Sequence, residues 1–188
     1  HCISSAASDV YKRQLKKAAN HFGVISQMAN QGHTTNGIRQ VKEWYEAGIL
    51  GEVREVHAWF GEFNFKPGHW WDKPSEFPPK KQTIPKTLDW NLWLGPAKNR
   101  NYNKVYVPKS WRGFFDFGNG QLGDWSCHTL DAPFWALNLG MPTSVFGNVP
   151  EPRAKENFVA DKSTVEFTFP ANNDRKSVKL KWYEGGFK

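Results

Sequence analysis

The residue types best suited to acid–base chemistry lie together at positions 120–131, which contain Asp124, His128 and Asp131. Their spacing puts all three on one face if the segment is helical. Imidazole titrates near neutral pH, and a carboxylate one helical turn away can orient it and stabilise its charged form. The pattern favours a proton-transfer pair of His128 and Asp124. A half-buried hydrogen bond without catalysis is the common alternative for such a pair.

Apolar side chains lie on both sides of the stripe formed by Asp124, His128 and Asp131, and they favour a position of this stripe in a sheltered cleft. They are Leu122, Trp125, Leu130, Phe134 and Trp135. Pro133 lacks a backbone donor and clashes with the preceding helical turn. We therefore expect the helix to kink or to restart near Asp131.

Composition excludes several classes of protein. The 188 residues are 39% hydrophobic and 23% charged, as in a folded globular domain. No apolar run of about 18 residues exists, so we expect no membrane span. The net charge of +7 comes from scattered basic residues without a long basic run or a nucleic-acid motif. It therefore favours anionic small ligands over nucleic acid as partners.

Cysteine usage indicates neither a disulfide framework nor a metal site. The two cysteines are Cys2, at the start of the chain, and Cys127, beside His128. A nucleophilic role for Cys127 is weak, because adjacent helical residues point in different directions. Zinc is not expected either, because no second Cys/His pair stands at ligand spacing.

Hydrophobic periodicity predicts helices and strands that would position these residues. In the first half we expect helices at residues 15–22, from Thr34 or Thr35 to Gly48, and at 88–94, and strands at 24–28 and 53–60. The long segment 61–87 is rich in proline, lysine and aromatic residues, which is typical of a surface excursion near a site.

The last quarter of the chain has the alternating pattern of an antiparallel hairpin. Apolar and polar residues alternate over Ser163–Phe169, and again from Val178 through Leu180 to Trp182. The intervening loop, residues 170–176, contains the turn-forming Asn and Asp residues that join such strands.

Several motifs occur in an order that resembles one enzyme family. They are QMANQGH at 27–33, LDWNLWLGP at 88–96, WRG at 111–113, GQLGDWSCHTLD at 120–131 and PFWAL at 133–137. Together they resemble the C-terminal half of the Gfo/Idh/MocA oxidoreductases, which include glucose–fructose oxidoreductase and inositol 2-dehydrogenase. The resemblance runs from about Leu15 to the end of the chain.

The resemblance implies an α/β (α+β) chain made of the end of a Rossmann domain and a C-terminal domain. The second domain would have a large, mostly antiparallel open sheet with helices on one face, and this sheet implies a homo-oligomer. We expect residues 1–14 to be a non-native end, 15–33 to be the Rossmann remnant, and 34–188 to be the truncated C-terminal substrate and oligomerisation domain. The sequence lacks the family's Glu-Lys-Pro motif and its Gly-rich phosphate-binding turn, so we expect the fragment alone to be inactive.

The chemistry implied by the resemblance is oxidation of a sugar or cyclitol hydroxyl. Hydride would pass to NAD or NADP while His128, oriented by Asp124, takes the hydroxyl proton. Two alternatives stay open. One is a redox-cycling NAD-dependent glycosidase, and the other is a non-catalytic carbohydrate-binding domain.

Other candidate site residues accompany this pair. By similarity, Asn30 would lie on the nicotinamide side at the carboxyl end of a strand, or it is a simple turn residue. Gln31 and His33 are nearby candidates for substrate binding. Arg112 offers forked donors to a cofactor or substrate, or it forms a surface salt bridge. Asp131 would accept a hydrogen bond from a substrate hydroxyl, or it caps a helix.

Aromatic residues are abundant, with 10 Trp and 14 Phe in the chain. Trp111 and Tyr102, with Trp70 and Trp71, are candidates for a wall on which a sugar ring stacks, the alternative being core packing. Trp125 stands where many family members carry a small or aliphatic residue, so we expect a narrowed pocket.

Overall fold

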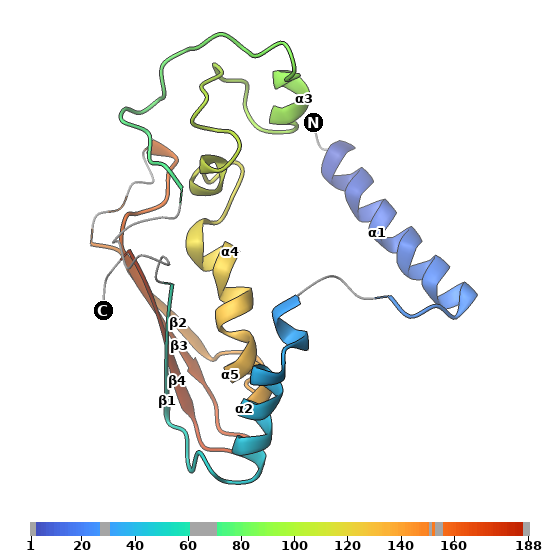
Figure 1. Cartoon of the computed structure of the whole chain (residues 1–188), viewed down its shortest axis with the longest axis vertical. Helices are drawn as coiled ribbons and strands as arrows, with labels where there is room; N and C mark the ends of the chain where they lie inside the picture. The colour runs from blue at the N-terminus through green and yellow to red at the C-terminus, as the bar shows by residue number, and fades with distance from the viewer. Residues whose placement is uncertain (1–2, 27–30, 61–70, 151, 153–155, 186–188) are drawn as a thin grey trace. The chain divides into compact units, whose positions relative to one another are not determined.

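The computed structural model describes residues 3–26, 31–60, 71–150, 152 and 156–185 (Figure 1). The chain divides into two compact units. The smaller unit comprises residues 1–29 and 79–104, and the larger unit comprises residues 30–78 and 105–188.

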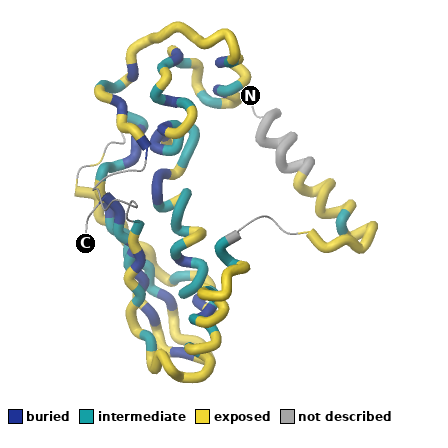
Figure 2. Tube along the Cα trace, in the orientation of Figure 1, coloured by how far each residue is buried: buried dark blue, intermediate teal, exposed yellow. Residues whose placement is uncertain are grey.

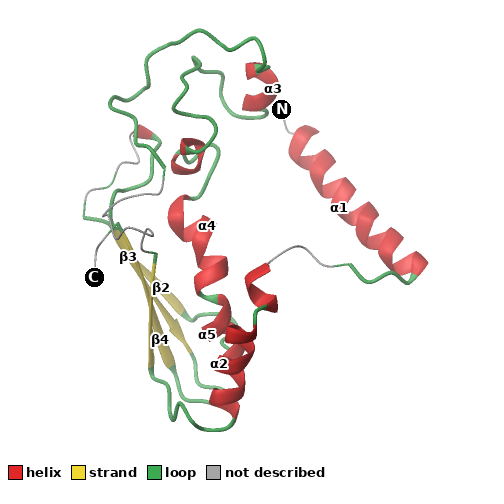
Figure 3. Ribbon diagram, viewed as in Figure 1, coloured by secondary structure: helices red, strands yellow, loops and turns green. Residues whose placement is uncertain are grey.

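The larger unit is built on an open sheet of four strands in the order β1-β4-β3-β2. Strands β2, β3 and β4 are labelled in Figure 3. The strands are β1 (Glu55–Trp59), β2 (Ser144–Asn148), β3 (Ser163–Phe169) and β4 (Val178–Glu184). Strands β2 and β4 both pair antiparallel with β3, whereas β1 pairs parallel with β4. The predicted α/β class and the predicted C-terminal hairpin are therefore confirmed.

Helices cover one face of this sheet (Figure 1). They are α2 (Asn36–Glu46), α4 (Gly120–Thr129) and α5 (Asp131–Ala136), with the 3-10 turns η1 (Gln31–Thr34) and η2 (Ser110–Gly113) leading into α2 and α4. Buried positions recur along the strands and at the junction of α4 with α5 (Figure 2).

The side chains of β4 alternate between the two faces of the sheet, and those on one face form the core. Val178, Leu180 and Trp182 have no exposed surface, while Lys179 and Lys181 point to the other face. The buried residues pack against Leu130 and other apolar side chains of the helical layer. Burial of each such side chain contributes about 1.5–3 kcal/mol. The helical layer is thereby fixed to the sheet.

The smaller unit contains α1 (Ile3–Phe22) and α3 (Trp90–Leu94). The carboxylate of Asp89 accepts a hydrogen bond of 2.9 Å from the backbone N–H of Leu92 and so caps α3. This confirms the helix predicted near residues 88–94. None of the described helices is long and apolar enough to cross a membrane.

The predicted strand at 24–28 is not formed over residues 24–26, which have no regular structure, and residues 27 and 28 lie outside the described part. Val24 and Ile25 are exposed. A short apolar strand gains its stability by pairing with neighbouring strands, and the described residues supply none to this segment. Of the surface excursion expected over residues 61–87, residues 61–70 lie outside the described part, and residues 71–87 contain bends and turns but no helix or strand.

A buried arginine joins the hairpin loop to the helical layer. The guanidinium of Arg175 donates hydrogen bonds to the carbonyls of Leu137 and Leu139, which follow α5. It also donates to the carbonyls of Pro170 and Lys176 in its own loop. These four distances lie between 2.7 and 2.9 Å. One side chain therefore satisfies carbonyls on two separate segments.

We expect Arg175→Ala to lower the free energy of unfolding by about 3 kcal/mol, because it leaves these buried carbonyls without their donor. Chemical denaturation of the full-length protein measures the loss. Lys179→Ala, on the exposed face of β4, is the control and should change stability by less than about 0.5 kcal/mol. Equal effects of the two substitutions would contradict the bridging role of Arg175.

Candidate active site at the junction of α4 and α5

The predicted helix is formed and carries both Asp124 and His128. Helix α4 spans Gly120–Thr129 and therefore holds Asp124 and His128 one turn apart on the same face. Helix α5 begins at Asp131, so the helix restarts there, as the position of Pro133 predicts. The break lies at Leu130, which is buried in the core of the larger unit.

Asp124 forms an ion pair with Arg112 of η2. The distance between Nε of the arginine and Oδ2 of the carboxylate is 3.3 Å, and both side chains are partly buried. The guanidinium also lies 4.4 Å from the centroid of the Trp111 indole ring. Arg112 thus forms a salt bridge, which was one of the two expectations from the sequence, and this bridge joins η2 to the middle of α4.

Two glycines allow η2 to approach its neighbours closely. A Cβ atom on Gly113 would collide with the ring of Phe158. A Cβ atom on Gly118 would collide with the backbone of Arg112 itself. Only residues without a side chain permit this packing, which fixes the backbone from which Arg112 reaches α4.

His128 is exposed and therefore accessible to a ligand. Its ring lies edge-on to Trp125, with 5.6 Å between the ring centroids. The ring of Trp125 in turn packs against the ring of Phe60, with 4.5 Å between the ring centroids. Trp125 therefore packs against one side of the imidazole of His128, the candidate base. The thiol of Cys127 donates a hydrogen bond of 3.4 Å to the backbone carbonyl of Asp124.

A second histidine–carboxylate pair lies at the start of α5. Nδ1 of His33, on η1, is 2.9 and 3.0 Å from the two carboxylate oxygens of Asp131. The His33 ring also lies 4.7 Å from the ring of Trp135. Asp131 therefore binds an imidazole. The N-cap position of α5 belongs to Leu130, which makes no side-chain capping bond.

The sequence indicates His33 and Asp131 as separate candidates and gives no sign that they pair. The two residues are 98 positions apart, so no helical or strand spacing connects them. Their pairing depends on η1 lying beside α5, which a single sequence does not reveal.

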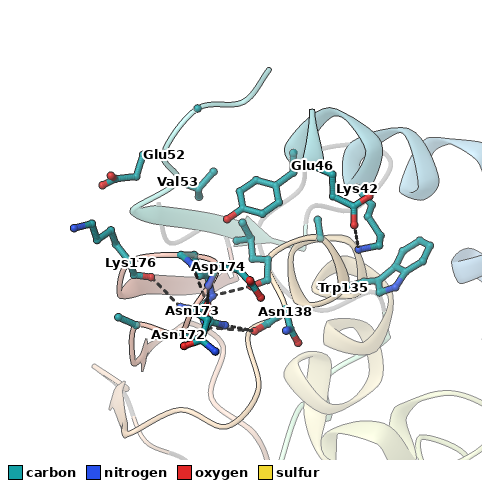
Figure 4. Close-up of a pocket in the computed structure, with 16 residues that line it drawn as sticks. Lys42, Glu46, Glu52, Val53, Trp135, Asn138, Asn172, Asn173, Asp174 and Lys176 are labelled. Atoms are coloured by element: carbon teal, nitrogen blue, oxygen red, sulfur yellow. Dashed lines mark hydrogen bonds and ion pairs between the residues drawn. The ribbon is translucent and has the colours of Figure 1, made fainter. Parts of the chain in front are cut away.

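A polar groove opens beyond this pair, at the end of α2 and α5 and along the loop between β3 and β4 (Figure 4). Its volume is about 1110 Å³. Trp135 lines the groove, and Nζ of Lys42 lies 5.4 Å from the centroid of this indole. Lys42 also binds Glu46. Trp135 therefore contacts His33 and also forms part of the groove wall.

The remaining candidates are dispersed. Asn30 and Trp70 lie outside the described residues, and Gln31 is the first residue of η1. Tyr102 is buried in the smaller unit, edge-on to the ring of Trp90. Trp71 is buried in the larger unit. Within the described part of the chain, no three His, Cys, Asp or Glu residues are grouped to hold a metal ion.

The Arg112–Asp124 pair should show measurable coupling. In a double-mutant cycle with Arg112→Met and Asp124→Asn, we expect a coupling free energy of about 0.5–1 kcal/mol, because both groups are partly shielded from water. Denaturant unfolding of the wild type, the two single variants and the double variant measures this coupling free energy. The more exposed pair of Lys179 with Glu166, 3.6 Å apart, serves as control and should couple near zero. Zero coupling at both pairs would refute a structural role for Arg112.

Comparison with known proteins agrees with this architecture. No curated protein matches the chain. A family model described as the oxidoreductase family, C-terminal alpha/beta domain, matches residues 34–174, which is more than half of the chain. The match covers η2, α4, α5 and the sheet as far as the loop after β3. The chain therefore belongs to the Gfo/Idh/MocA oxidoreductase family, through the C-terminal α/β domain of that family.

Proposed function

We propose that this domain forms the substrate side of an NAD(P)-dependent oxidoreductase that acts on a hydroxyl of a sugar or cyclitol. The observation that carries this proposal is an exposed histidine on α4, His128, one turn from the carboxylate of Asp124, in a domain of an oxidoreductase family. An accessible imidazole on a rigid helix is suited to accept a proton from a bound hydroxyl.

Oxidation of an alcohol removes a proton from oxygen and a hydride from carbon as the C=O bond forms. A bound nicotinamide would supply the hydride acceptor. A ring nitrogen of His128 takes the hydroxyl proton and becomes positively charged. Asp124, one helical turn away, is the candidate to orient the ring, and its charge is compensated by the ion pair with Arg112. In that ion pair, Arg112 limits the movement of the Asp124 carboxylate.

The described residues offer a proton acceptor and one candidate cofactor contact, but no cradle for a dinucleotide. Arg112 has forked donors that suit an anionic or amide group, and its place beside α4 brings them to the proton-transfer pair. The sequence contains no glycine-rich turn for a dinucleotide pyrophosphate. We therefore assign to this domain the binding of the polyol and the handling of its proton, with Arg112 and Asn30 as candidate cofactor contacts.

The decisive experiment uses the full-length protein with NAD or NADP and a panel of sugars, cyclitols and aryl glycosides. We expect reduction of the nicotinamide, followed by absorbance, and a loss of about 10²–10⁴-fold in kcat for His128→Ala. Cys127→Ala is the matched control, because this exposed neighbour points in another direction from the helix and should retain activity.

Other outcomes of the same assay identify the alternatives. Glycoside release without net nicotinamide reduction would assign the protein as a redox-cycling glycosidase. Sugar binding without either reaction would indicate a carbohydrate-binding domain. Full activity in His128→Ala would exclude this histidine as the proton acceptor.

We also propose that the second face of the sheet, opposite the helices, mediates self-association. This face carries the aromatic residues Trp59 and Phe146, which are 50% and 71% exposed. His57 stacks on Tyr183 of the neighbouring strand and lies 2.8 Å from its hydroxyl oxygen. Exposed aromatic side chains between polar groups are typical of protein interfaces. A second copy with the same face would cover both aromatic positions.

Trp59→Glu should therefore shift the full-length protein toward the monomer, because the interface would bury a charge in place of an indole. Sedimentation velocity over a concentration series measures the shift. Gln40→Glu, which adds the same charge to an exposed position of α2, should leave the distribution unchanged. A wild-type protein that stays monomeric throughout would contradict the self-association.

A further inference from the structure

The pair of His33 and Asp131 has the geometry of an oriented imidazole. Both carboxylate oxygens lie within 3.0 Å of Nδ1, and the carboxylate side chain is only 16% exposed. A carboxylate at Nδ1 holds the ring proton on that nitrogen in the neutral form. The lone pair then remains on Nε2, which becomes the hydrogen-bond acceptor of the ring.

The surroundings hold this ring in place. Asp131 begins α5, next to Leu130 in the core of the larger unit. On the other side, η1 leads into α2, and the hydroxyl of Thr35 donates a hydrogen bond of 2.8 Å to the carbonyl of Gly32. The indole of Trp135 packs against the imidazole. The side chain of His33 is nevertheless 37% exposed, so a ligand can reach it.

The two carboxylates of the stripe are thus used differently. Asp124 is neutralised by a guanidinium, that of Arg112, and its partner cation carries a fixed charge. Asp131 binds an imidazole, whose second nitrogen can accept from a ligand hydroxyl. Asp131 follows His128 by three residues, across the break at Leu130, so the pair of His33 and Asp131 lies next in sequence to the candidate base.

We propose that His33 contacts the polyol substrate, accepting a hydrogen bond at Nε2 from a hydroxyl other than the one oxidised, and that Asp131 is its positioning residue. This inference rests on the proposed function and adds a determinant of specificity to it. Asp131 then acts through His33 and does not itself bind the substrate. The favoured ligands carry a second hydroxyl, and deoxy analogues that lack this hydroxyl bind poorly, because a fixed acceptor is left without a donor.

The orientation of the ring can be tested without any substrate. In the full-length protein labelled with ¹⁵N-histidine, two-bond proton–nitrogen correlations at alkaline pH should show His33 with its proton on Nδ1. Asp131→Leu should abolish this preference, whereas Asp124→Asn, the matched carboxylate change, should leave it intact. A proton on Nε2 in the wild-type protein would overturn the inference.

The contact with substrate is tested by His33→Phe, which keeps a ring against Trp135 and removes Nε2. The probes are glucose, myo-inositol and their monodeoxy analogues. We expect kcat/KM for the best substrate to fall on the order of 100-fold, and the fall to vanish for the one analogue that lacks the contacted hydroxyl. Asp131→Leu should show the same pattern, with partial recovery in Asp131→Glu.

A purely structural role of the pair predicts a different result. The variants would then lose activity equally on all substrates and analogues, which would overturn the proposed contact while leaving the proposed function intact. Absence of turnover by the wild-type protein with every probe would instead refute the proposed function, and with it the role of His33 as a polyol ligand.

Discussion

The candidate site depends on the packing of the helix break against the sheet. Leu130, at the break, joins Leu137 and Leu139 in the core with the apolar side of β4, whose Leu180 and Trp182 have no exposed surface. Leu130 is buried in the core, whereas His128, two residues before it, is exposed and Asp131, one residue after it, binds His33. The hydrophobic contact therefore decides which way the reactive groups point.

Around this junction, each of the two carboxylates binds a different basic side chain. Arg112 reaches Asp124 from η2, and His33 reaches Asp131 from η1. A partly buried carboxylate requires such partners, because desolvation without them is costly. The first pair joins α4 to the neighbouring turn η2, and the second joins α5 to a segment 98 residues away, so the interactions that satisfy the carboxylates also shape the site.

Elements whose signals are local could be predicted. The hairpin of β3 and β4 follows from strict alternation, and the restart of the helix at Asp131 follows from Pro133. The family itself is also indicated by short motifs. The strand expected at 24–28 is not formed over residues 24–26, because an apolar run becomes a strand only where another strand pairs with it.

The sequence by itself determined the class of the fold, the oxidoreductase family and the stripe of Asp124, His128 and Asp131, since these depend on residue type and on spacing within a few helical turns. It also left the partners of the carboxylates open. The tertiary structure alone decided that Asp131 binds His33, 98 residues away. A contact between such distant residues depends on how η1 and α5 pack, and no periodicity of the backbone encodes that arrangement.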